Sequence, residues 1–292
     1  MILCIVGPTG VGKTKLSVEL AKKYNAIVVN GDSMQVYKEL NIGTAKVTES
    51  EKEGIEHKLF DIVNPKDMYT VYDYQKDLRN ILDNKKNKNI IIVGGTGLYI
   101  KAGLYNYIFE TENNIDNKYD KLTNEELYDL ALKKDKDCNI HINNRKRLIR
   151  FLNKTETIQD KDKLLYNVIF IGLTTSREIL YERINKRVDI MIQNGLLEEV
   201  KSLYDRNIRS KAILTGIGYK ELYEYFDGKI SIDNTIKLIK QRSRHYAKRQ
   251  YTWFNNQMNI NWFNVDFNDF NNTVNDVIEF IDGVKWNCYT II

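Results

Sequence analysis

Gly7-Pro8-Thr9-Gly10-Val11-Gly12-Lys13-Thr14 carries the strongest structural signal in this chain. It fits the pattern G-x-x-x-x-G-K-[ST], with an apolar run at residues 2–6 before it and a helical pattern at residues 15–24 after it. Glycines let successive N–H groups point inward, and the following helix turns its positive dipole end toward an anion. Lys13 adds a positive charge, and the Thr14 hydroxyl is a ligand for Mg²⁺. The motif predicts a diphosphate or triphosphate site; the alternative is a glycine-rich turn that matches by chance.

Composition bounds the class of protein. The chain has 292 residues, long enough for one large α/β domain or for a core with an insertion. Hydrophobic residues make up 42% and charged residues 28%, as in ordinary globular proteins. The net charge of +5 permits a nucleic-acid partner but does not require one.

Cysteines and apolar runs bear on the compartment. Cys4, Cys138 and Cys288 are far apart and odd in number, which argues against a zinc site and a disulfide framework. No apolar run approaches the length of a membrane span, and the first expected strand begins at Ile2, which leaves no room for a signal peptide. We therefore expect a cytoplasmic protein with no membrane partner.

A second apolar run, residues 26–30, is typical of a buried strand and ends at Gly31-Asp32-Ser33. In an open α/β sheet the carboxyl ends of neighbouring strands face one crevice, so Asp32 and Ser33 are expected beside the phosphate loop. There Asp32 is a candidate acid–base group. It is equally a candidate for a helix N-cap or a turn residue, and position alone does not separate the two interpretations.

Two further features could serve the same ligand. Gly94-Gly95-Thr96-Gly97 follows an apolar strand at residues 90–93, and it could offer N–H groups and a hydroxyl, unless it is a plain strand-to-helix turn. An expected helix at residues 176–207 opens with Ser176 as its N-cap and carries Arg183 and Arg187 on one face. Guanidinium groups suit bidentate phosphate binding, although surface helices also carry such arginines without a role.

A basic stripe marks the expected helix at residues 233–254. Its cations at helical spacing include Lys237, Lys240, Arg244 and Lys248. With Tyr246, Trp253 and Phe254 beside them, they would suit an RNA backbone with stacked bases. The alternative is a solvated basic face with the aromatic residues in the core, and residue types alone favour that alternative.

The composition changes between residues 101 and 167. A polar and acidic stretch precedes a short expected helix at residues 124–134, and the basic cluster Arg145-Lys146-Arg147-Leu148-Ile149-Arg150 follows. A strand pattern returns at residues 167–172. We therefore expect a core in two parts, residues 1–104 and 166–292, the second with basic C-terminal helices, interrupted by a small insertion at residues 105–165.

Several blocks, in one order from Gly7 to Phe254, resemble the tRNA dimethylallyltransferase (tRNA isopentenyltransferase) family. Besides the phosphate loop they are Asp32-Ser33-Met34-Gln35-Val36-Tyr37, Ile42-Gly43-Thr44-Ala45-Lys46, His57-Lys58-Leu59-Phe60-Asp61, Val93-Gly94-Gly95-Thr96-Gly97-Leu98-Tyr99, Arg187-Val188-Asp189-Ile190-Met191, Ile217-Gly218-Tyr219-Lys220-Glu221 and Tyr246-Ala247-Lys248-Arg249-Gln250-Tyr251-Thr252-Trp253-Phe254. The insertion departs from the family pattern, because His141-Ile142-Asn143-Asn144 stands where His-Pro-Asn-Asp is usual and Lys146 replaces a common Gln.

The resemblance implies a P-loop NTPase-like α/β fold with a parallel sheet and a small helical insertion that grips the anticodon stem. It implies transfer of a dimethylallyl group from its diphosphate to N6 of the adenosine immediately 3′ of the anticodon, tRNA position 37. The P-loop would then hold an isoprenoid diphosphate, and ATP need not be a substrate. The expected partners are tRNA, through its anticodon stem-loop, and dimethylallyl diphosphate, and we expect a monomer.

The resemblance also assigns roles on the diphosphate side of the site. Lys13, the loop N–H groups and Arg187 hold the diphosphate, together with Mg²⁺ on the Thr14 hydroxyl. Thr9 and Thr96 add hydroxyl donors.

On the tRNA side, Asp32 accepts the proton of the adenine amine. The pocket that receives the base is formed by Asp32, Ser33, Met34, Gln35 and Thr96. The expected contacts to the rest of the tRNA are Lys146, Arg147, Arg150, Arg244 and Lys248.

Two other functions use the same residues. An adenylate-type prenyltransferase or small-molecule kinase would use the phosphate loop and Asp32 on a small acceptor, but the Ile42–Lys46 block and the basic helix resemble the tRNA-acting branch. A noncatalytic RNA-binding P-loop protein would have no need of a carboxylate beside the loop.

Overall fold

The computed structural model describes residues 1–84, 88–109, 119, 121–153 and 163–284, so Cys288 lies outside it. The chain divides into two compact units, Met1–Leu104 with Leu164–Ile292, and Tyr105–Lys163. The second unit corresponds to the insertion expected at residues 105–165, and its last residue is 163.

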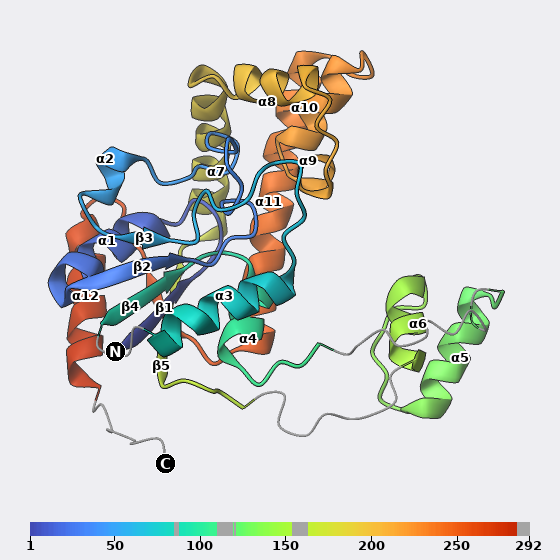
Figure 1. Ribbon diagram of the computed structural model, residues 1–292, viewed down its shortest axis with the longest axis horizontal. Coiled ribbons are helices and arrows are strands. Elements are labelled where there is room, and N and C mark those ends of the chain that lie inside the picture. Colours follow the sequence, from blue (N-terminus) through green and yellow to red (C-terminus); the bar gives the residue numbers. More distant parts are fainter. Residues whose placement is uncertain (85–87, 110–118, 120, 154–162, 285–292) are drawn as a thin grey trace. The chain divides into compact units, whose positions relative to one another are not determined.

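The first unit is built on one six-stranded sheet in which all the pairings are parallel (Figure 1). The strand order is β3-β2-β4-β1-β5-β6. The strands are β1 (Ile2–Val6), β2 (Ala26–Asn30), β3 (His57–Lys58), β4 (Asn89–Val93), β5 (Val168–Thr174) and β6 (Asn261–Asn264). The central strands are almost wholly buried, as expected when helices cover both faces of a parallel sheet. The predicted α/β fold class is confirmed.

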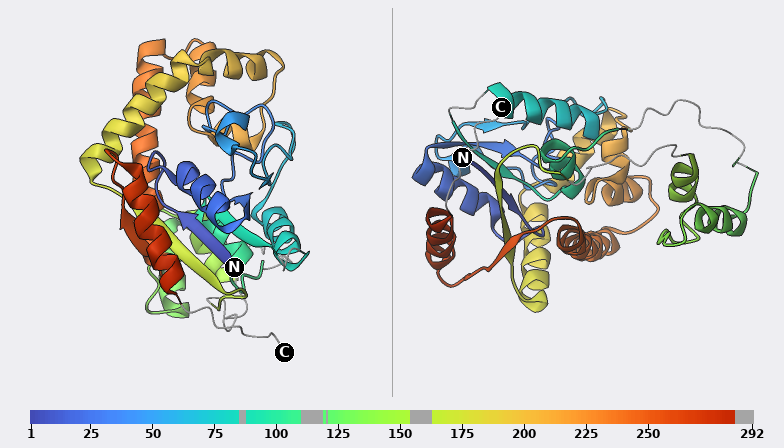
Figure 2. Two further views of the ribbon diagram at one scale, coloured as in Figure 1. Left: turned by 90° about the vertical axis from the view of Figure 1, so that its left-hand side faces the viewer. Right: turned by 90° about the horizontal axis from the view of Figure 1, so that it is seen from below.

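Helices cover the sheet on both faces (Figure 2). On one face lie α1 (Lys13–Tyr24) and α12 (Phe270–Gly283), whose Leu16 and Val277 are fully buried against the sheet. On the other lie α3 (Val71–Asn84) and α4 (Gly97–Leu104). The short α2 (Glu49–Lys52), whose N-cap is Thr48, precedes the edge strand β3. Each large apolar side chain buried in this way stabilises the fold by about 1.5–3 kcal/mol.

Five helices form a second core within the first unit. They are α7 (Arg177–Gln193), α8 (Leu196–Asp205), α9 (Lys211–Thr215), α10 (Tyr219–Phe226) and α11 (Ile232–Gln257). Leu196, Val200, Leu203, Ile213 and Leu222 are fully buried there, together with Tyr219. This helical cluster stands at the top of Figure 1, and α11 packs along α7.

The single helix expected at residues 176–207 is wrong, because the chain breaks between α7 and α8. Gly195 has a φ of 95°, in the left-handed region that glycine adopts without steric cost, and it is the N-cap of α8. The start of the expected helix is confirmed, since the Ser176 hydroxyl accepts a hydrogen bond from the Ile179 N–H.

The second unit contains α5 (Asn124–Lys134) and α6 (Arg145–Asn153), so the helix predicted at residues 124–134 is confirmed. A small core of its own includes Leu127, Ala131 and Leu148. Within the basic cluster, Arg145 donates hydrogen bonds to backbone carbonyls, whereas the side chains left exposed on α6 are Lys146, Arg147 and Arg150.

Among the described helices, none has the length and apolar character that crossing a bilayer requires.

The turns after β2 and β4 approach so closely that they exclude a side chain. A Cβ on Gly94 would lie 2.1 Å from the carbonyl carbon of Gly31. We predict that Gly94→Ala lowers the free energy of unfolding by about 3 kcal/mol, because backbone must shift to make room. Urea denaturation measures this, and Gly283→Ala is the control, since nothing lies within 4 Å of its added Cβ. Equal stability of Gly94→Ala and wild type would contradict the prediction.

Candidate active site

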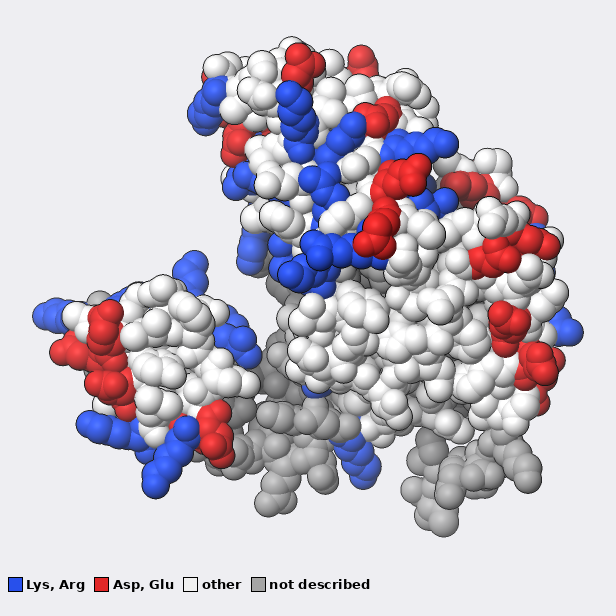
Figure 3. Space-filling model, turned by 180° about the vertical axis from the view of Figure 1, so that it is seen from behind, with Lys and Arg blue, Asp and Glu red and all other residues white. Residues whose placement is uncertain are grey.

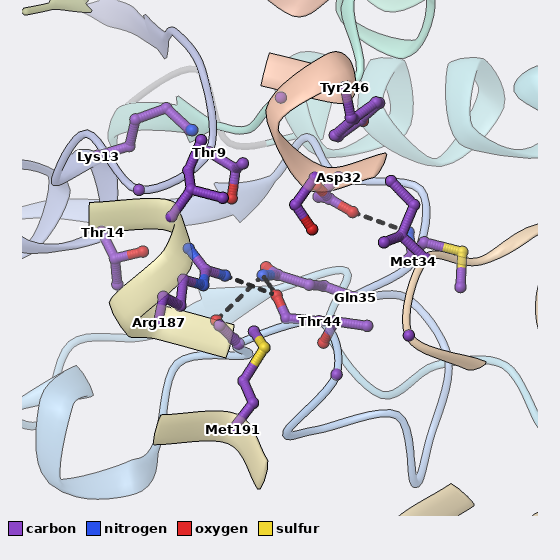
Figure 4. Close-up of a pocket in the computed structure, with 18 of the residues that line it drawn as sticks. Thr9, Lys13, Thr14, Asp32, Met34, Gln35, Thr44, Arg187, Met191 and Tyr246 are labelled. Carbon is purple, nitrogen blue, oxygen red and sulfur yellow. Dashed lines mark hydrogen bonds between the residues drawn. The ribbon is translucent and has the colours of Figure 1, made fainter. Parts of the chain in front are cut away.

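A cavity of about 730 Å³ lies at the carboxyl edge of the sheet, between the strand ends and the helical cluster. Its volume is in the range of small-molecule sites. Expected site residues that line it are Thr9, Gly10, Gly12, Lys13, Thr14, Asp32, Ser33, Met34, Gln35 and Arg187. Gly7, Pro8 and Val11 are buried and complete the phosphate loop behind this lining. Figure 4 shows Thr9, Lys13 and Thr14 on one side with Arg187 below Thr9, and Asp32 and Tyr246 on the other side.

The phosphate loop has the geometry that its sequence predicts. Gly12 is the N-cap of α1 with a φ of 101°, and a Cβ there would lie 2.8 Å from the Phe270 ring. The first turn of α1 has no acidic residue, and no described side chain caps it. The N–H groups at this helix end are therefore available to an anion.

Lys13 lies at the centre of the loop, where its Nζ donates hydrogen bonds to the carbonyl oxygens of Gly7 (3.0 Å) and Pro8 (2.8 Å). Burial lowers the pKa of Lys13 to about 7; Arg187 adds to the shift and Asp32 opposes it. At neutral pH the amine is therefore only about half protonated. A bound anion would favour its charged form.

The two arginines of α7 have different surroundings. Arg187 donates from Nη2 to the Thr44 carbonyl (3.3 Å), and its Nε is buried with no hydrogen-bond partner among the described residues. Burial lowers the pKa of Arg187, and Asp32 opposes the shift. Arg183 instead donates to the Gly10 carbonyl (3.1 Å) and lies 3.9 Å over the Phe267 ring. Both arginines line the cavity. The Nε of Arg183 contacts the phosphate loop, whereas the buried Nε of Arg187 has no hydrogen-bond partner among the described residues and could donate to a ligand.

Asp32 forms a turn and also lines the cavity. Asn30, which is fully buried, fixes its backbone: the Asp32 N–H donates to Asn30 Oδ1 (2.8 Å), and Asn30 Nδ2 donates to the Asp32 carbonyl (2.9 Å). Asp32 Oδ1 accepts from the Met34 N–H (2.9 Å), which closes a turn; no helix begins there. The carboxylate also lines the cavity. A Cβ added at Gly95 would lie 3.8 Å from its second oxygen, Oδ2.

Thr96 was expected to donate its hydroxyl to the diphosphate, but its hydroxyl contacts Ser33 instead. Its Oγ1 accepts from the Ser33 N–H (3.0 Å) and donates to Ser33 Oγ (3.2 Å). Thr96 is not among the described residues that line the cavity, whereas Ser33 is. The Thr96 hydroxyl therefore orients the turn that carries Asp32 and Ser33. Gly94 and Gly95 supply the lining from this second glycine-rich turn.

Gln250 of α11 was not predicted as a site residue, although it joins both glycine-rich turns. Its Oε1 accepts from the Thr9 N–H (2.9 Å), and its Nε2 donates to the Gly95 carbonyl (3.0 Å). The Thr9 N–H is thus used within the protein. The sequence held one signal for this role, a glutamine on the core side of an amphipathic helix. A buried amide needs hydrogen-bond partners, so such a glutamine indicates a polar contact inside the protein.

Tyr246 and Arg249, on the same helix as Gln250, also line the cavity. Burial raises the pKa of Tyr246, and Asp32 adds to the shift. The hydroxyl therefore stays protonated as a donor beside the Asp32 carboxylate.

The basic stripe of α11 is partly used within the protein. Lys240 pairs with Asp189 (2.6 Å) and Arg244 donates to Asn185 (2.6 Å), so both cations tie α11 to α7. Phe254 is fully buried, as the core interpretation has it. Lys248 is exposed. Figure 3 shows Lys and Arg side chains gathered over the helical cluster, with acidic ones among them.

Oxygen donors in the cavity suit Mg²⁺. The Thr14 hydroxyl and the Asp32 carboxylate both line it, and Mg²⁺ prefers hard oxygen ligands. Within the described ranges no three His, Cys, Asp or Glu side chains gather as a metal site. The donor set therefore fits an ion held largely by water and substrate phosphates.

Fold and site together define a class: α/β proteins with a cavity at the carboxyl edge of a parallel sheet, lined by a glycine-rich loop, by cations and by a carboxylate. The family model described as IPP transferase matches residues 35–257. The chain belongs to the IPP transferase family.

Individual relatives agree. The chain is 45% identical to the tRNA dimethylallyltransferase of Bacillus subtilis, over 90% of each chain. It is similar to the crystal structure of a tRNA delta(2)-isopentenylpyrophosphate transferase from Staphylococcus epidermidis, with 40% identity, a TM-score of 0.75 and coverage of 96% of this chain and 98% of the other. A eukaryotic dimethylallyltransferase acting on tRNA matches with 26% identity and a TM-score of 0.80, over 99% of this chain and 81% of the other.

The lowered pKa of Lys13 predicts that an anion binds together with a proton. At pH 8 about 0.9 of the amine is neutral if its pKa is about 7, so inorganic diphosphate should bind with uptake of nearly one proton. Uptake means that affinity weakens as pH rises above 7. Calorimetry in buffers of different ionisation enthalpy measures it. Lys13→Arg, always charged, should bind without that uptake; equal uptake by both proteins would contradict the prediction.

Proposed function

We propose that this protein transfers a dimethylallyl group from dimethylallyl diphosphate to N6 of adenosine 37 in tRNA. One observation carries the proposal: the phosphate loop with Lys13 and Arg187 shares a single cavity with the Asp32 carboxylate. The relatives named for this reaction support it.

The reaction breaks the allylic C–O bond and forms a C–N bond. Negative charge develops on the departing diphosphate, and positive charge develops on the allyl carbons. Lys13, Arg187 and the free N–H groups of α1 stabilise the departing oxygens, and each such donor is typically worth about 3–4 kcal/mol in the transition state. When bound, Mg²⁺ neutralises further charge on the diphosphate, with the Thr14 hydroxyl as its ligand from the protein.

The adenine amine is a weak nucleophile because its lone pair is delocalised into the ring. Asp32 accepts the proton that the amine loses as the C–N bond forms, and the turn to Met34 holds the carboxylate in place. The Tyr246 hydroxyl beside it stays a donor, since its pKa is raised.

The target base must leave its stack to reach the cavity, at a cost of a few kcal/mol. Met34 and Gln35 line the cavity beside Asp32. Gln35 donates from Nε2 to the carbonyls of Thr44 (3.0 Å) and Ala45 (3.3 Å), so its Oε1 is held as an acceptor for the base.

Exposed cations would hold the rest of the tRNA, with the anticodon stem-loop as the part recognised. On the second unit they are Lys146, Arg147 and Arg150 of α6, and on α11 Lys248. We propose a monomer that acts on tRNA in the cytoplasm.

Mass spectrometry of nucleosides tests the proposal directly. The protein, Mg²⁺, dimethylallyl diphosphate and unmodified tRNA should yield N6-(dimethylallyl)adenosine at position 37 and one equivalent of diphosphate. Modification of free adenylate instead, or no prenylated product at all, would overturn it.

Asp32→Asn separates the catalytic role from the turn. Asparagine keeps the oxygen that accepts from the Met34 N–H but loses the charge, so both substrates should still bind while the chemical step slows by about two to four orders of magnitude. Single-turnover transfer with saturating substrates measures the rate. A rate within about threefold of wild type would leave Asp32 with the turn alone.

Counterion release tests the cations of α6. Replacing Arg147 and Arg150 by Ala should flatten the log–log salt dependence of tRNA affinity by about 0.7–0.9 for each phosphate that is no longer neutralised. Lys23→Ala with Lys76→Ala removes the same charge from exposed sites on α1 and α3, and should leave the slope unchanged. Equal slopes for the two double variants would remove α6 from the tRNA interface.

A further inference from the structure

Glu199 of α8 holds the loop formed by residues 41–46 through three hydrogen bonds and accepts a fourth from Tyr219. Its Oε2 accepts from the N–H groups of Asn41 (2.9 Å) and Ile42 (2.7 Å). Its Oε1 accepts from the Gly43 N–H (3.1 Å) and the Tyr219 hydroxyl (2.7 Å). Three successive backbone N–H groups thus converge on one carboxylate that comes from a helix more than 150 residues further along the chain.

Two further contacts fix the same loop: the Tyr219 ring packs on Gly43, and the Lys46 side chain anchors the end of the loop at residue 46. A Cβ on Gly43 would lie 2.7 Å from the Tyr219 ring, so the ring closes over the loop backbone. Lys46 is buried and donates to the Tyr37 carbonyl (2.6 Å), to Asn41 (2.9 Å) and to Asp61 (2.6 Å). Between these two attachments Ala45 has a φ of 47°, in the left-handed region that non-glycine residues adopt only when their surroundings impose it.

The loop in turn holds two side chains of the candidate active site. The Thr44 carbonyl accepts from Arg187 Nη2 (3.3 Å) and from Gln35 Nε2 (3.0 Å), as the dashed lines in Figure 4 mark. Thr44 follows directly after the amides that Glu199 binds, so the position of its carbonyl depends on that carboxylate. Within the described ranges this carbonyl is the hydrogen-bond acceptor that orients Arg187, since the Nε of the guanidinium is buried without a partner there.

We propose that Glu199 is a positioning residue for the transfer reaction, acting through the Thr44 carbonyl on the Arg187 guanidinium and the Gln35 amide. The inference rests on the proposed function for the roles of Arg187 and Gln35. Glu199 is not among the described residues that line the cavity. It keeps a strained loop in the one conformation that aims a cation at the diphosphate and an amide at the base.

A double-mutant cycle separates positioning from a merely structural role. Glu199→Gln keeps the size of the side chain but replaces one oxygen by an amide NH₂ group, which faces the two donors that this oxygen bound, so the loop loosens. The single-turnover transfer rate should fall about 10- to 100-fold per folded molecule, with the tRNA Kd unchanged. In an Arg187→Ala background the same substitution should cost less than about threefold, because the guanidinium through which it mainly acts is gone and only its smaller effect through Gln35 remains.

Glu198→Gln is the matched control, because it removes the same charge one residue away from an exposed side chain. Its rate should match wild type. If Glu199→Gln does not fold, Tyr219→Phe removes one of the four hydrogen bonds and keeps the ring on Gly43. We then expect the rate to fall about two- to fivefold with the same dependence on Arg187. Equal costs with and without Arg187, for whichever variant folds, would overturn the proposal.

The failure of the proposed function would be visible separately. It fails if wild type produces no prenylated tRNA. The same four proteins of the cycle are then compared for their affinity for inorganic diphosphate, which needs no transfer. Coupling between Glu199 and Arg187 in that affinity supports the positioning role, and additivity overturns it.

Discussion

Parallel pairing of β2, β4 and β1 brings three turns of the chain to one edge of the sheet, and the candidate active site exists because of it. The register pairs Asn30 with Val93 and Ile5 with Val93, so the strands end side by side. The next residues are the start of the phosphate loop, the Asp32 turn and the second glycine-rich turn. Gly31 and Gly94 allow the last two to touch, since a Cβ on Gly94 would collide with the backbone of Gly31.

The electrostatics of the cavity follow from this convergence. Lys13 and Arg187 line the cavity together with Arg183, Lys186 and Arg249, and burial lowers the pKa of Lys13 and of Arg187. Among the described residues that line the cavity, Asp32 is the one carboxylate, so the cations outnumber it and would attract an anion. A bound diphosphate would offset these positive charges and would favour the protonated form of Lys13.

The helical cluster stabilises the loops around the cavity through polar side chains. Gln250 ties the phosphate loop to the second glycine-rich turn, and Glu199 holds the loop whose carbonyls orient Arg187 and Gln35. These contacts bring a helix of the second core to each loop of the site. A buried amide or carboxylate that makes several hydrogen bonds is costly to displace, which is what a fixed catalytic geometry requires.

Local signals in the sequence were enough to predict the parallel α/β fold, the phosphate loop, Asp32 beside it and the helix at residues 124–134. Those signals are apolar runs of strand length, the spacing of glycines, and capping residues. The insertion was predicted from a change in composition. Three other features emerged from the folded chain alone: Gly195 separates two helices, Arg183 binds the Gly10 carbonyl while Arg187 binds the Thr44 carbonyl, and Thr96 binds Ser33. They could not be predicted because the two arginines and Thr96 take their roles from partners distant in the chain. The bond between Thr9 and Gln250, 241 residues apart, is of the same kind, since no local pattern encodes which distant groups will meet.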